Sequence, residues 1–270
     1  MSKIILIPKE QPEVPIEANN ITPDEFAGKS LDEIKKIKIW YGNSEVPLAD
    51  FFEVSGESGA TASDTTIVID GDVFNTKRIG QEMSAGEIIV NGNVNMYVGA
   101  EMTGGKITVE GNAASWAGQN MKGGELTIKG DAGDYVGSAY RGDWRGMDGG
   151  VLTVYGNVGN EIAEFMLSGK IIIKGNANIM PGIRMHGGLL VIEGDVVART
   201  GAAMKYGNIV VEGTISEFLP GFEYVDIVKD IEIDGTSFKG AYYKFVGDNC
   251  NRGADGAIYA SVLNNRHILP

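Results

Sequence analysis

Apolar and polar residues alternate in short runs that recur along the middle of the chain. In residues 87–105 (EIIVNGNVNMYVGAEMTGG), Ile88 and Val90 share one face of a predicted strand, because successive side chains of a strand point to opposite faces. Aliphatic residues fill the same two positions in the later repeats. The pairs are Ile107 and Val109, Leu126 and Ile128, Leu152 and Val154, Ile171 and Ile173, and Leu190 and Ile192. We expect these two columns to face the interior.

A glycine closes each predicted strand and defines the repeat length. The closing glycines are Gly71, Gly92, Gly111, Gly130, Gly156, Gly175, Gly194 and Gly213, so the steps are 21, 19, 19, 26, 19, 19 and 19 residues. A near-constant period of this size is typical of a solenoid, in which each unit buries its apolar side against its neighbours. Short strands joined at glycine corners favour an all-β fold, a parallel β-helix of about seven to eight coils.

Two further columns support this interpretation. Asn or Asp follows most closing glycines, and these residue types tolerate a left-handed backbone at a corner. Seven of the ten methionines also recur at one position, where stacked adaptable side chains are expected to fill an interior. They are Met83, Met102, Met121, Met147, Met166, Met185 and Met204.

The chain divides into three predicted parts. Residues 1–62 form an arm that holds five of the eight prolines and is expected to run mostly extended. Within it, Ser30 and Glu33 form a capping box that predicts a short helix through Lys36, followed by a hairpin over residues 37–48. Residues 63–221 form the repeats. Residues 222–270 are expected to cap the solenoid with strands at 227–233, 241–246 and 257–262.

Charge and cysteine content exclude several classes of function. The formal net charge of −13 disfavours binding to nucleic acids and to anionic membrane surfaces. The single cysteine, Cys250, excludes an internal disulfide and a cysteine-ligated iron–sulfur cluster contained in this chain. The apolar run near the N-terminus is too short for a signal peptide or a membrane-spanning helix. A cytoplasmic protein without membrane insertion is therefore expected.

Candidate catalytic groups are few. His186 and His267 are the only histidines, and neither has a second histidine or a cysteine at a spacing typical of metal ligands. Carboxylates recur at Asp131, Asp134, Asp143 and Asp148, and β-helix polysaccharide lyases and glycosidases use paired carboxylates as acid and base. The positions of these carboxylates at corners and strand ends favour a structural role instead.

The repeat is interrupted at one corner, next to a column of aromatic residues. Seven extra residues occupy positions 140–146 (YRGDWRG), and they include Arg141, Trp144 and Arg145. The column holds Tyr97, Trp116 and Tyr135, which are expected to face outward by strand alternation. Stacked Tyr and Trp flanked by Arg are enriched at interface hot spots, so we predict a partner interface formed by these six residues. The alternative is a ladder that only stabilises one face of the fold.

The repeat and its glycine corners resemble the GXGXG domain at the C-terminal end of the glutamate synthase large subunit. Longer stretches resemble the C subunit of formylmethanofuran dehydrogenase of methanogenic archaea, across essentially the full length. They are IILIPKEQPEVPIEA, DGDVFNTKRIGQEMSAGEIIVNGNVNMYVGAEM and YRGDWRGMDGG. The repeat is also similar to the C subunit of the bacterial formyltransferase/hydrolase complex.

The resemblance implies a right-handed β-helix within a cytoplasmic oxidoreductase complex. That complex reduces carbon dioxide and attaches the product to methanofuran as a formyl group, the first step of methanogenesis from CO2. In the family, other subunits hold the tungsten- or molybdenum-pterin, the iron–sulfur clusters and a binuclear metal site. The chain is then expected to be a non-catalytic structural subunit, without catalytic, cofactor-binding or metal-binding residues, that contacts the hydrolase-like and pterin-binding subunits. A formyltransferase/hydrolase subunit and a polysaccharide hydrolase or lyase remain alternatives.

Overall fold

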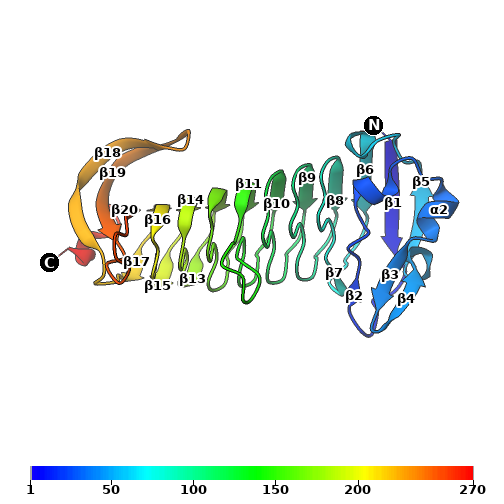
Figure 1. Ribbon diagram of the computed structural model, residues 1–270, viewed down its shortest axis with the longest axis horizontal. Helices are drawn as coiled ribbons and strands as arrows, with labels where there is room; N and C mark the ends of the chain where they lie inside the picture. The colour runs from blue at the N-terminus through cyan, green and yellow to red at the C-terminus, as the bar shows by residue number, and fades with distance from the viewer. Residues whose placement is uncertain (1, 270) are drawn as a thin grey trace.

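The computed structural model describes residues 2–269, so Met1 and Pro270, the outer ends of the predicted arm and cap, lie outside the described residues. The fold is nearly all-β, and one 13-stranded sheet runs along its whole length (Figure 1). Its order is β18-β19-β20-β16-β14-β12-β11-β10-β9-β8-β6-β1-β5. No helix within residues 2–269 is long and apolar enough to cross a membrane.

The repeats supply the central, parallel part of this sheet. Its strands are β6 (Thr65–Ile69), β8 (Glu87–Val90), β9 (Lys106–Val109), β10 (Glu125–Ile128), β11 (Asp148–Val154), β12 (Ser168–Ile173), β14 (His186–Ile192) and β16 (Tyr206–Val211). Equivalent positions lie opposite each other, as in Ile88 with Ile107. Leu126 lies opposite Leu152 in the same way, although seven extra residues separate them. The insertion therefore leaves the strand register intact.

The interior of the stack is filled as the repeat predicts. The two aliphatic columns and all seven methionines of the predicted column are fully buried. A second, three-stranded sheet of β13 (Ala177–Ile179), β15 (Val196–Ala198) and β17 (Ile215–Glu217) lies in the later repeats. Identical positions thus pack on each other along the stack, which confirms the expected inward columns.

The corner residues act differently from the expectation. The Asn and Asp residues after the closing glycines do not have a positive φ, so the predicted left-handed backbone at these positions is wrong. Their side chains instead link adjacent repeats. Asn112 Oδ1 accepts the backbone N–H of Asp131 at 2.8 Å, and Asp131 Oδ1 accepts that of Asn157 at 2.7 Å. This series of corner hydrogen bonds continues with the N–H groups of Asn176, Asp195 and Thr214, each of which donates to the corner side chain of the preceding repeat. Each rung satisfies a backbone donor that a plain turn would leave to solvent.

The N-terminal residues join the same sheet. β1 (Ser2–Pro8) pairs in parallel with β6 and antiparallel with β5 (Phe52–Gly56). Two short helices follow, α1 (Pro23–Phe26) and α2 (Leu31–Lys35), and the capping box of Ser30 and Glu33 is present. The predicted hairpin forms β3 (Lys38–Tyr41) and β4 (Ser44–Pro47), which share a four-stranded sheet with β2 (Ile16–Glu17) and β7 (Thr76–Lys77). Short 3-10 turns lie at Leu48–Asp50, Ala62–Asp64 and Arg266–Ile268.

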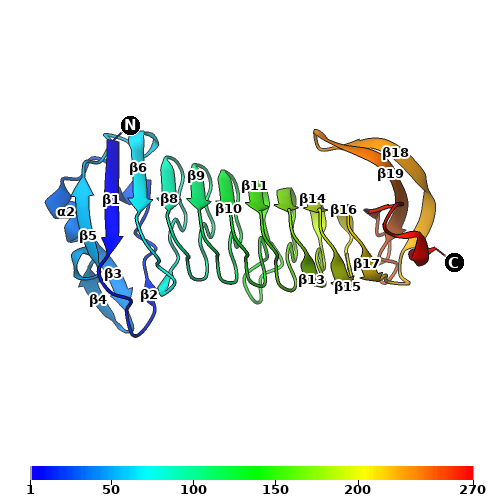
Figure 2. The same ribbon diagram turned by 180° about the vertical axis from the view of Figure 1, so that it is seen from behind.

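The C-terminal strands extend the sheet and fold back over it. β20 (Gly256–Ser261) pairs in parallel with β16, while β18 (Glu223–Ile233) and β19 (Thr236–Gly247) form a long antiparallel hairpin. The hairpin arches over the neighbouring repeats in both views (Figures 1 and 2). It buries Leu189, Val191 and Val210 of the outer sheet face against Phe238 and Tyr242 in a second, smaller core. Strand pairing is continuous from the arm to the last strands, so the three-part division of the chain remains a prediction.

Candidate functional site

The predicted aromatic ladder exists as a continuous stack on one edge of the fold. The ring centroids of Tyr97 and Trp116 lie 5.5 Å apart with an interplanar angle of 18°. Those of Trp116 and Tyr135 lie 4.7 Å apart at 10°. These separations fall in the range of attractive offset stacking. The repeat therefore aligns three aromatic rings face to face, each half-buried by its neighbours.

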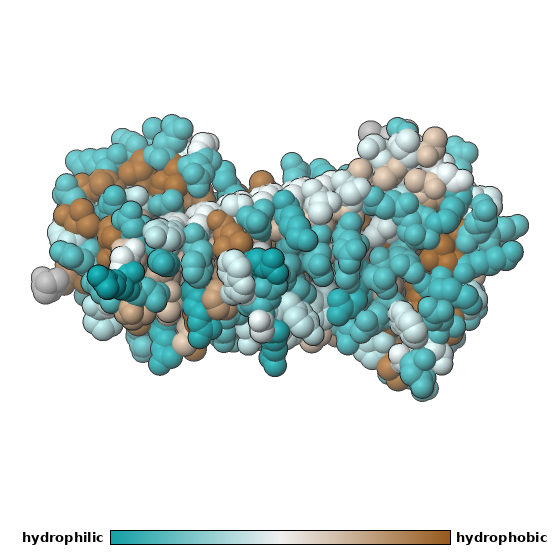
Figure 3. Space-filling model, viewed as in Figure 1, coloured by the Kyte–Doolittle hydropathy of each residue, from teal (hydrophilic) through white to brown (hydrophobic). Residues whose placement is uncertain are grey.

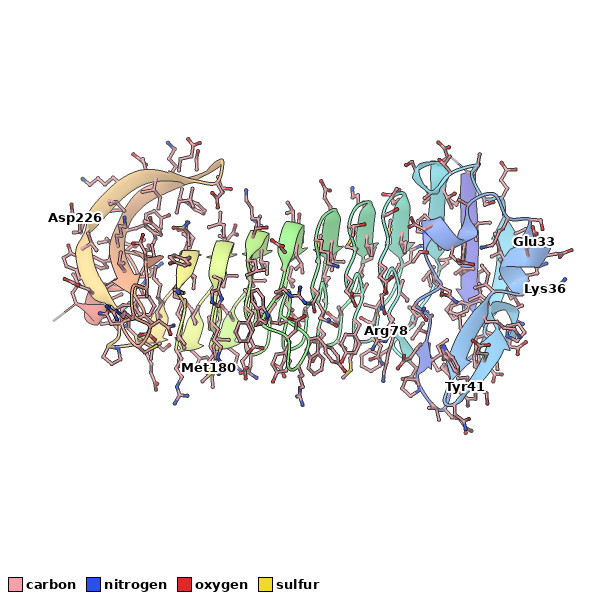
Figure 4. The ribbon with its side chains drawn as sticks, in the orientation of Figure 1. Glu33, Lys36, Tyr41, Arg78, Met180 and Asp226 are labelled. Carbon is pink, nitrogen blue, oxygen red and sulfur yellow. The ribbon has the colours of Figure 1, made fainter. Side chains whose placement is uncertain are left out.

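The residues of this aromatic column have a left-handed backbone conformation. Tyr97, Trp116 and Tyr135 have φ values of 66°, 61° and 63°, which are uncommon for bulky residues. The same conformation recurs at Arg78 and Met180, which are labelled along the lower edge of the stack (Figure 4). Because non-aromatic members of the column share it, the conformation belongs to the corner of the repeat and is not a strain specific to the aromatic site.

Two arginines cover the ladder. The Arg78 guanidinium lies 4.6 Å from the ring centroid of Tyr97, and its Nε donates to Glu17 at 3.2 Å. The Arg141 guanidinium lies 5.5 Å from the Trp116 ring and 6.0 Å from the Tyr135 ring. The inserted segment thus folds back over the ladder, and cation–π contacts hold it there. The ladder has a clear structural role, and its part in a partner interface stays a prediction.

The inserted segment, residues 140–146, is pinned by two side chains that the sequence did not single out as supports. Asn120 accepts the backbone N–H of Tyr140 at 3.0 Å and donates to the carbonyl of Arg145 at 2.6 Å. Asp143 Oδ1 accepts the backbone N–H groups of Trp144 at 2.7 Å and Arg145 at 3.2 Å. In the column that contains Glu82 and Glu101, Asn120 is the first residue that is not Glu, a break in the pattern that could have marked it.

The charge of Asp143 is stabilised in place. Partial burial opposes its charged form, but the hydrogen bond from the Arg145 side chain and those from the two backbone N–H groups outweigh it. Together they hold the pKa of Asp143 below its usual value. The Arg145 Nε lies 3.3 Å from Asp143 Oδ1. This carboxylate is a fixed structural anion at neutral pH rather than a proton donor.

The segment presents its largest side chains to solvent. Trp144 is 61% exposed and Tyr140 is 53% exposed, and the Arg145 guanidinium lies 5.5 Å from the Trp144 ring centroid. Two shallow polar hollows of about 320 Å³ and 210 Å³ flank it. Both hollows are lined by Glu101, Asn120 and Asp143. Arg141 therefore joins the inserted segment to the half-buried ladder, and the same segment carries the exposed Trp144 with Arg145.

The remaining candidate carboxylates accept hydrogen bonds from the following repeat. Asp131 and Asp134 accept backbone N–H groups of the following repeat, at 2.7 Å from Asn157 and 2.6 Å from Asn160. Asp148 Oδ1 accepts the hydroxyl of Ser168 at 2.9 Å. Each carboxylate thus has a structural hydrogen-bond partner, in agreement with the structural interpretation of these positions.

The two histidines are also separated. The His186 ring stacks on Phe165 at 6.1 Å, whereas His267 Nε2 lies 2.9 Å from the carbonyl oxygen of Ile215. Across residues 2–269, no group of three or more His, Cys, Asp or Glu side chains is placed to hold a metal ion. The expectation that the metal sites lie in other subunits stays a prediction.

Relatives of this chain are closely similar over its whole length, although no protein-family model matches it. It is 72% identical over 270 residues to the C subunit of the tungsten-containing formylmethanofuran dehydrogenase 2 of Methanothermobacter thermautotrophicus, covering all of both chains. It is 54% identical over 265 residues to the C subunit of the molybdenum-containing formylmethanofuran dehydrogenase 1 of Methanothermobacter marburgensis, covering 98% of this chain and 64% of that one.

A solved structure shares the fold. A chain in the crystal structure of the formyltransferase/hydrolase complex from Methylorubrum extorquens with methylofuran superposes with a TM-score of 0.82 at 26% identity. The match covers 95% of this chain and 99% of that one. The sequence relatives carry the more specific result. Because their matches span almost the entire sequence, the chain belongs to the family of formylmethanofuran dehydrogenase C subunits.

Proposed function

We propose that this chain is the non-catalytic structural subunit of a formylmethanofuran dehydrogenase complex. The observation that carries the proposal is the 72% identity to a C subunit of that enzyme over all of both chains. The complex would reduce CO2 and attach the product to methanofuran as a formyl group, in the cytoplasm. The chain would brace the metal-bearing subunits, because a long row of stacked repeats offers them a fixed surface.

The architecture suits such a brace. We infer that the stack is a right-handed parallel β-helix related to the GXGXG domain of glutamate synthase. The in-register pairing of residues 19 positions apart supports a helical path of constant pitch. A rigid rod of this kind changes little on binding, so subunits docked at separate points keep their spacing.

The chemistry would reside in other subunits. Iron–sulfur clusters and a binuclear metal site need clusters of histidine, cysteine or carboxylate ligands. The lack of such a group among residues 2–269 supports placing these two kinds of site outside this chain, and the metal–pterin is assigned to the pterin-binding subunit by the family resemblance. The hydrolase-like and pterin-binding subunits are the proposed partners, and the surface around Trp144 is the proposed contact.

A formyltransferase/hydrolase complex is the second candidate, favoured by the shared fold with the Methylorubrum extorquens complex. The two candidates differ in redox chemistry. The much higher identity to the dehydrogenase subunits supports the first.

Co-purification tests the proposal. The chain, tagged and expressed in its native host, is expected to elute from size exclusion in a large particle that contains tungsten or molybdenum and iron by elemental analysis. That particle should reduce CO2 in the presence of methanofuran. A chain that elutes alone, or a particle with formyl-transfer activity but no molybdenum, tungsten or iron–sulfur signal, would contradict it.

A further inference from the structure

The exposed tryptophan lies on a segment that is ordered before any partner binds. Trp144 is 61% exposed, yet the backbone on both sides of it is fixed by Asp143 and Asn120. Asp143 accepts two successive N–H groups, while Asn120 ties the first and sixth residues of the segment to the preceding repeat. An already ordered segment loses little conformational entropy when it binds, which favours an anchoring role.

The flanking charge indicates the chemistry of the partner. Among residues 2–269, no carboxylate lies within ion-pair distance of Arg141, whereas Arg78 and Arg145 each have one. The Arg141 side chain is exposed while its guanidinium rests on two aromatic rings, so its N–H edge remains free to bind an anion. This exposed cation lies on a chain whose net charge is −13. A complementary partner surface would therefore carry a carboxylate.

We propose that residues 140–146 form an anchor that inserts Trp144 into an apolar pocket on another subunit of the complex. A carboxylate beside that pocket pairs with Arg141. Asp143 and Asn120 are positioning residues, which set the direction of the tryptophan without touching the partner. This inference rests on the proposed function and specifies which surface docks and what it meets.

The test measures binding of full-length variants to the other subunits, purified together, by biolayer interferometry. Trp144→Ala is expected to raise Kd by about 30-fold or more, the loss typical of a buried hot-spot tryptophan. Arg141→Gln is expected to raise Kd and to flatten its dependence on salt, because one ion pair across the interface is lost. Tyr155→Ala is the matched control, since Tyr155 is 49% exposed and lies 4.3 Å from the Lys129 ammonium on another part of the surface.

The positioning role has its own readout. Asp143→Ala removes the oxygen that accepts both N–H groups and is expected to weaken binding nearly as much as Trp144→Ala. Asp143→Asn retains an amide oxygen in the same place and is expected to restore most of the affinity. All variants should melt within about 2 °C of the wild type, because the segment lies outside the core.

The outcomes separate the two proposals. If the wild-type chain binds but Trp144→Ala binds as tightly as Tyr155→Ala, the anchor is overturned and the structural role stands. If the wild-type chain does not bind the other subunits at all, the proposed function fails. If Trp144→Ala abolishes only self-association in sedimentation experiments, the pocket belongs to a second copy of this chain and the assigned partner is wrong.

Discussion

Substituting Gly118 by alanine tests whether the leucines packed around this position leave room for a methyl group. Gly118 has a φ of 65°, and a methyl group added there would overlap Leu152 Cδ1 and lie 3.5 Å from Leu126 Cδ2. The left-handed backbone costs an alanine about 1–2 kcal/mol. Forcing an extra carbon into a filled core costs about 1–3 kcal/mol more. We expect Gly118→Ala to lower the free energy of unfolding by about 2–5 kcal/mol.

Two companion variants separate these contributions. Gly42 has a similar φ of 60° in the β3–β4 hairpin with nothing within 4 Å of an added methyl, so Gly42→Ala should show only the backbone cost. Leu152→Val removes the overlapped carbon and should partly rescue Gly118→Ala, with a coupling energy of about 0.5–3 kcal/mol. Ala163, at a φ of 58° in the same column, indicates that the backbone alone tolerates a methyl there.

Urea denaturation followed by circular dichroism and by tryptophan fluorescence gives the free energies. The reasoning is refuted if Gly118→Ala costs no more than Gly42→Ala, or if Leu152→Val adds its own loss without any rescue. In either case the conflict with Leu152 does not determine why the column is glycine.

Three further predictions address the corner hydrogen bonds between repeats, the buried Tyr242 and the C-terminal hairpin. Asn112→Ala should lower the free energy of unfolding by about 0.5–1.5 kcal/mol in urea melts, because it replaces the hydrogen bond from the Asp131 N–H by one to solvent, whereas Asn112→Asp should cost less. Burial and the Glu212 carboxylate raise the pKa of Tyr242, so its folded phenol keeps its proton where an unfolded tyrosine loses it. This contribution to stability should be complete below about pH 10 and should be lost as the pH rises through the higher pKa of the folded state. In an absorbance titration, the Tyr242→Phe variant should lack the phenol that ionises last in the wild type. Val191→Thr should cost about 1–3 kcal/mol by thermal melting, because the hairpin buries this outer position and the new hydroxyl would have no assured partner.

Much of the stack could be predicted because its rules are local and repeated. The aliphatic columns and the methionines follow from a period that the sequence displays directly. The corner backbone could not be predicted in the same way. Left-handed conformations occur at Tyr97 and Trp116, residue types that rarely adopt them, and only the closing of the turn between adjacent repeats imposes them.

The hairpin over the outer face has a partial signal in the sequence. The outward position of successive strands changes from Thr108, Thr127 and Thr153 to Ile172 and Val191, an apolar change that indicates a covered face. Figure 3 shows apolar residues gathered over the C-terminal hairpin, while the outer surface along the middle of the stack is largely polar or neutral. Where the hairpin would lie depended on contacts such as Lys170 with Thr236, which are distant in sequence and have no local signature.

For the candidate site, composition identified the exposed Trp144 and the flanking arginines. The break at Asn120 in the Glu column was visible in the sequence, but its role was not, because Asn120 belongs to the preceding repeat and reaches the segment only after stacking. Hydrogen bonds between repeats depend on which corner faces which, and a linear pattern does not contain that information.

The undisturbed register across the seven-residue insertion has a consequence for how such chains diverge. Leu126 and Leu152 pair as though the insertion were absent, so seven extra residues at this corner leave the pairing of the core strands unchanged. Lineages are then free to lengthen, shorten or rewrite residues 140–146 while the scaffold stays the same. Sequence variation at this corner therefore changes the surface of the molecule and leaves the packing of the interior unchanged.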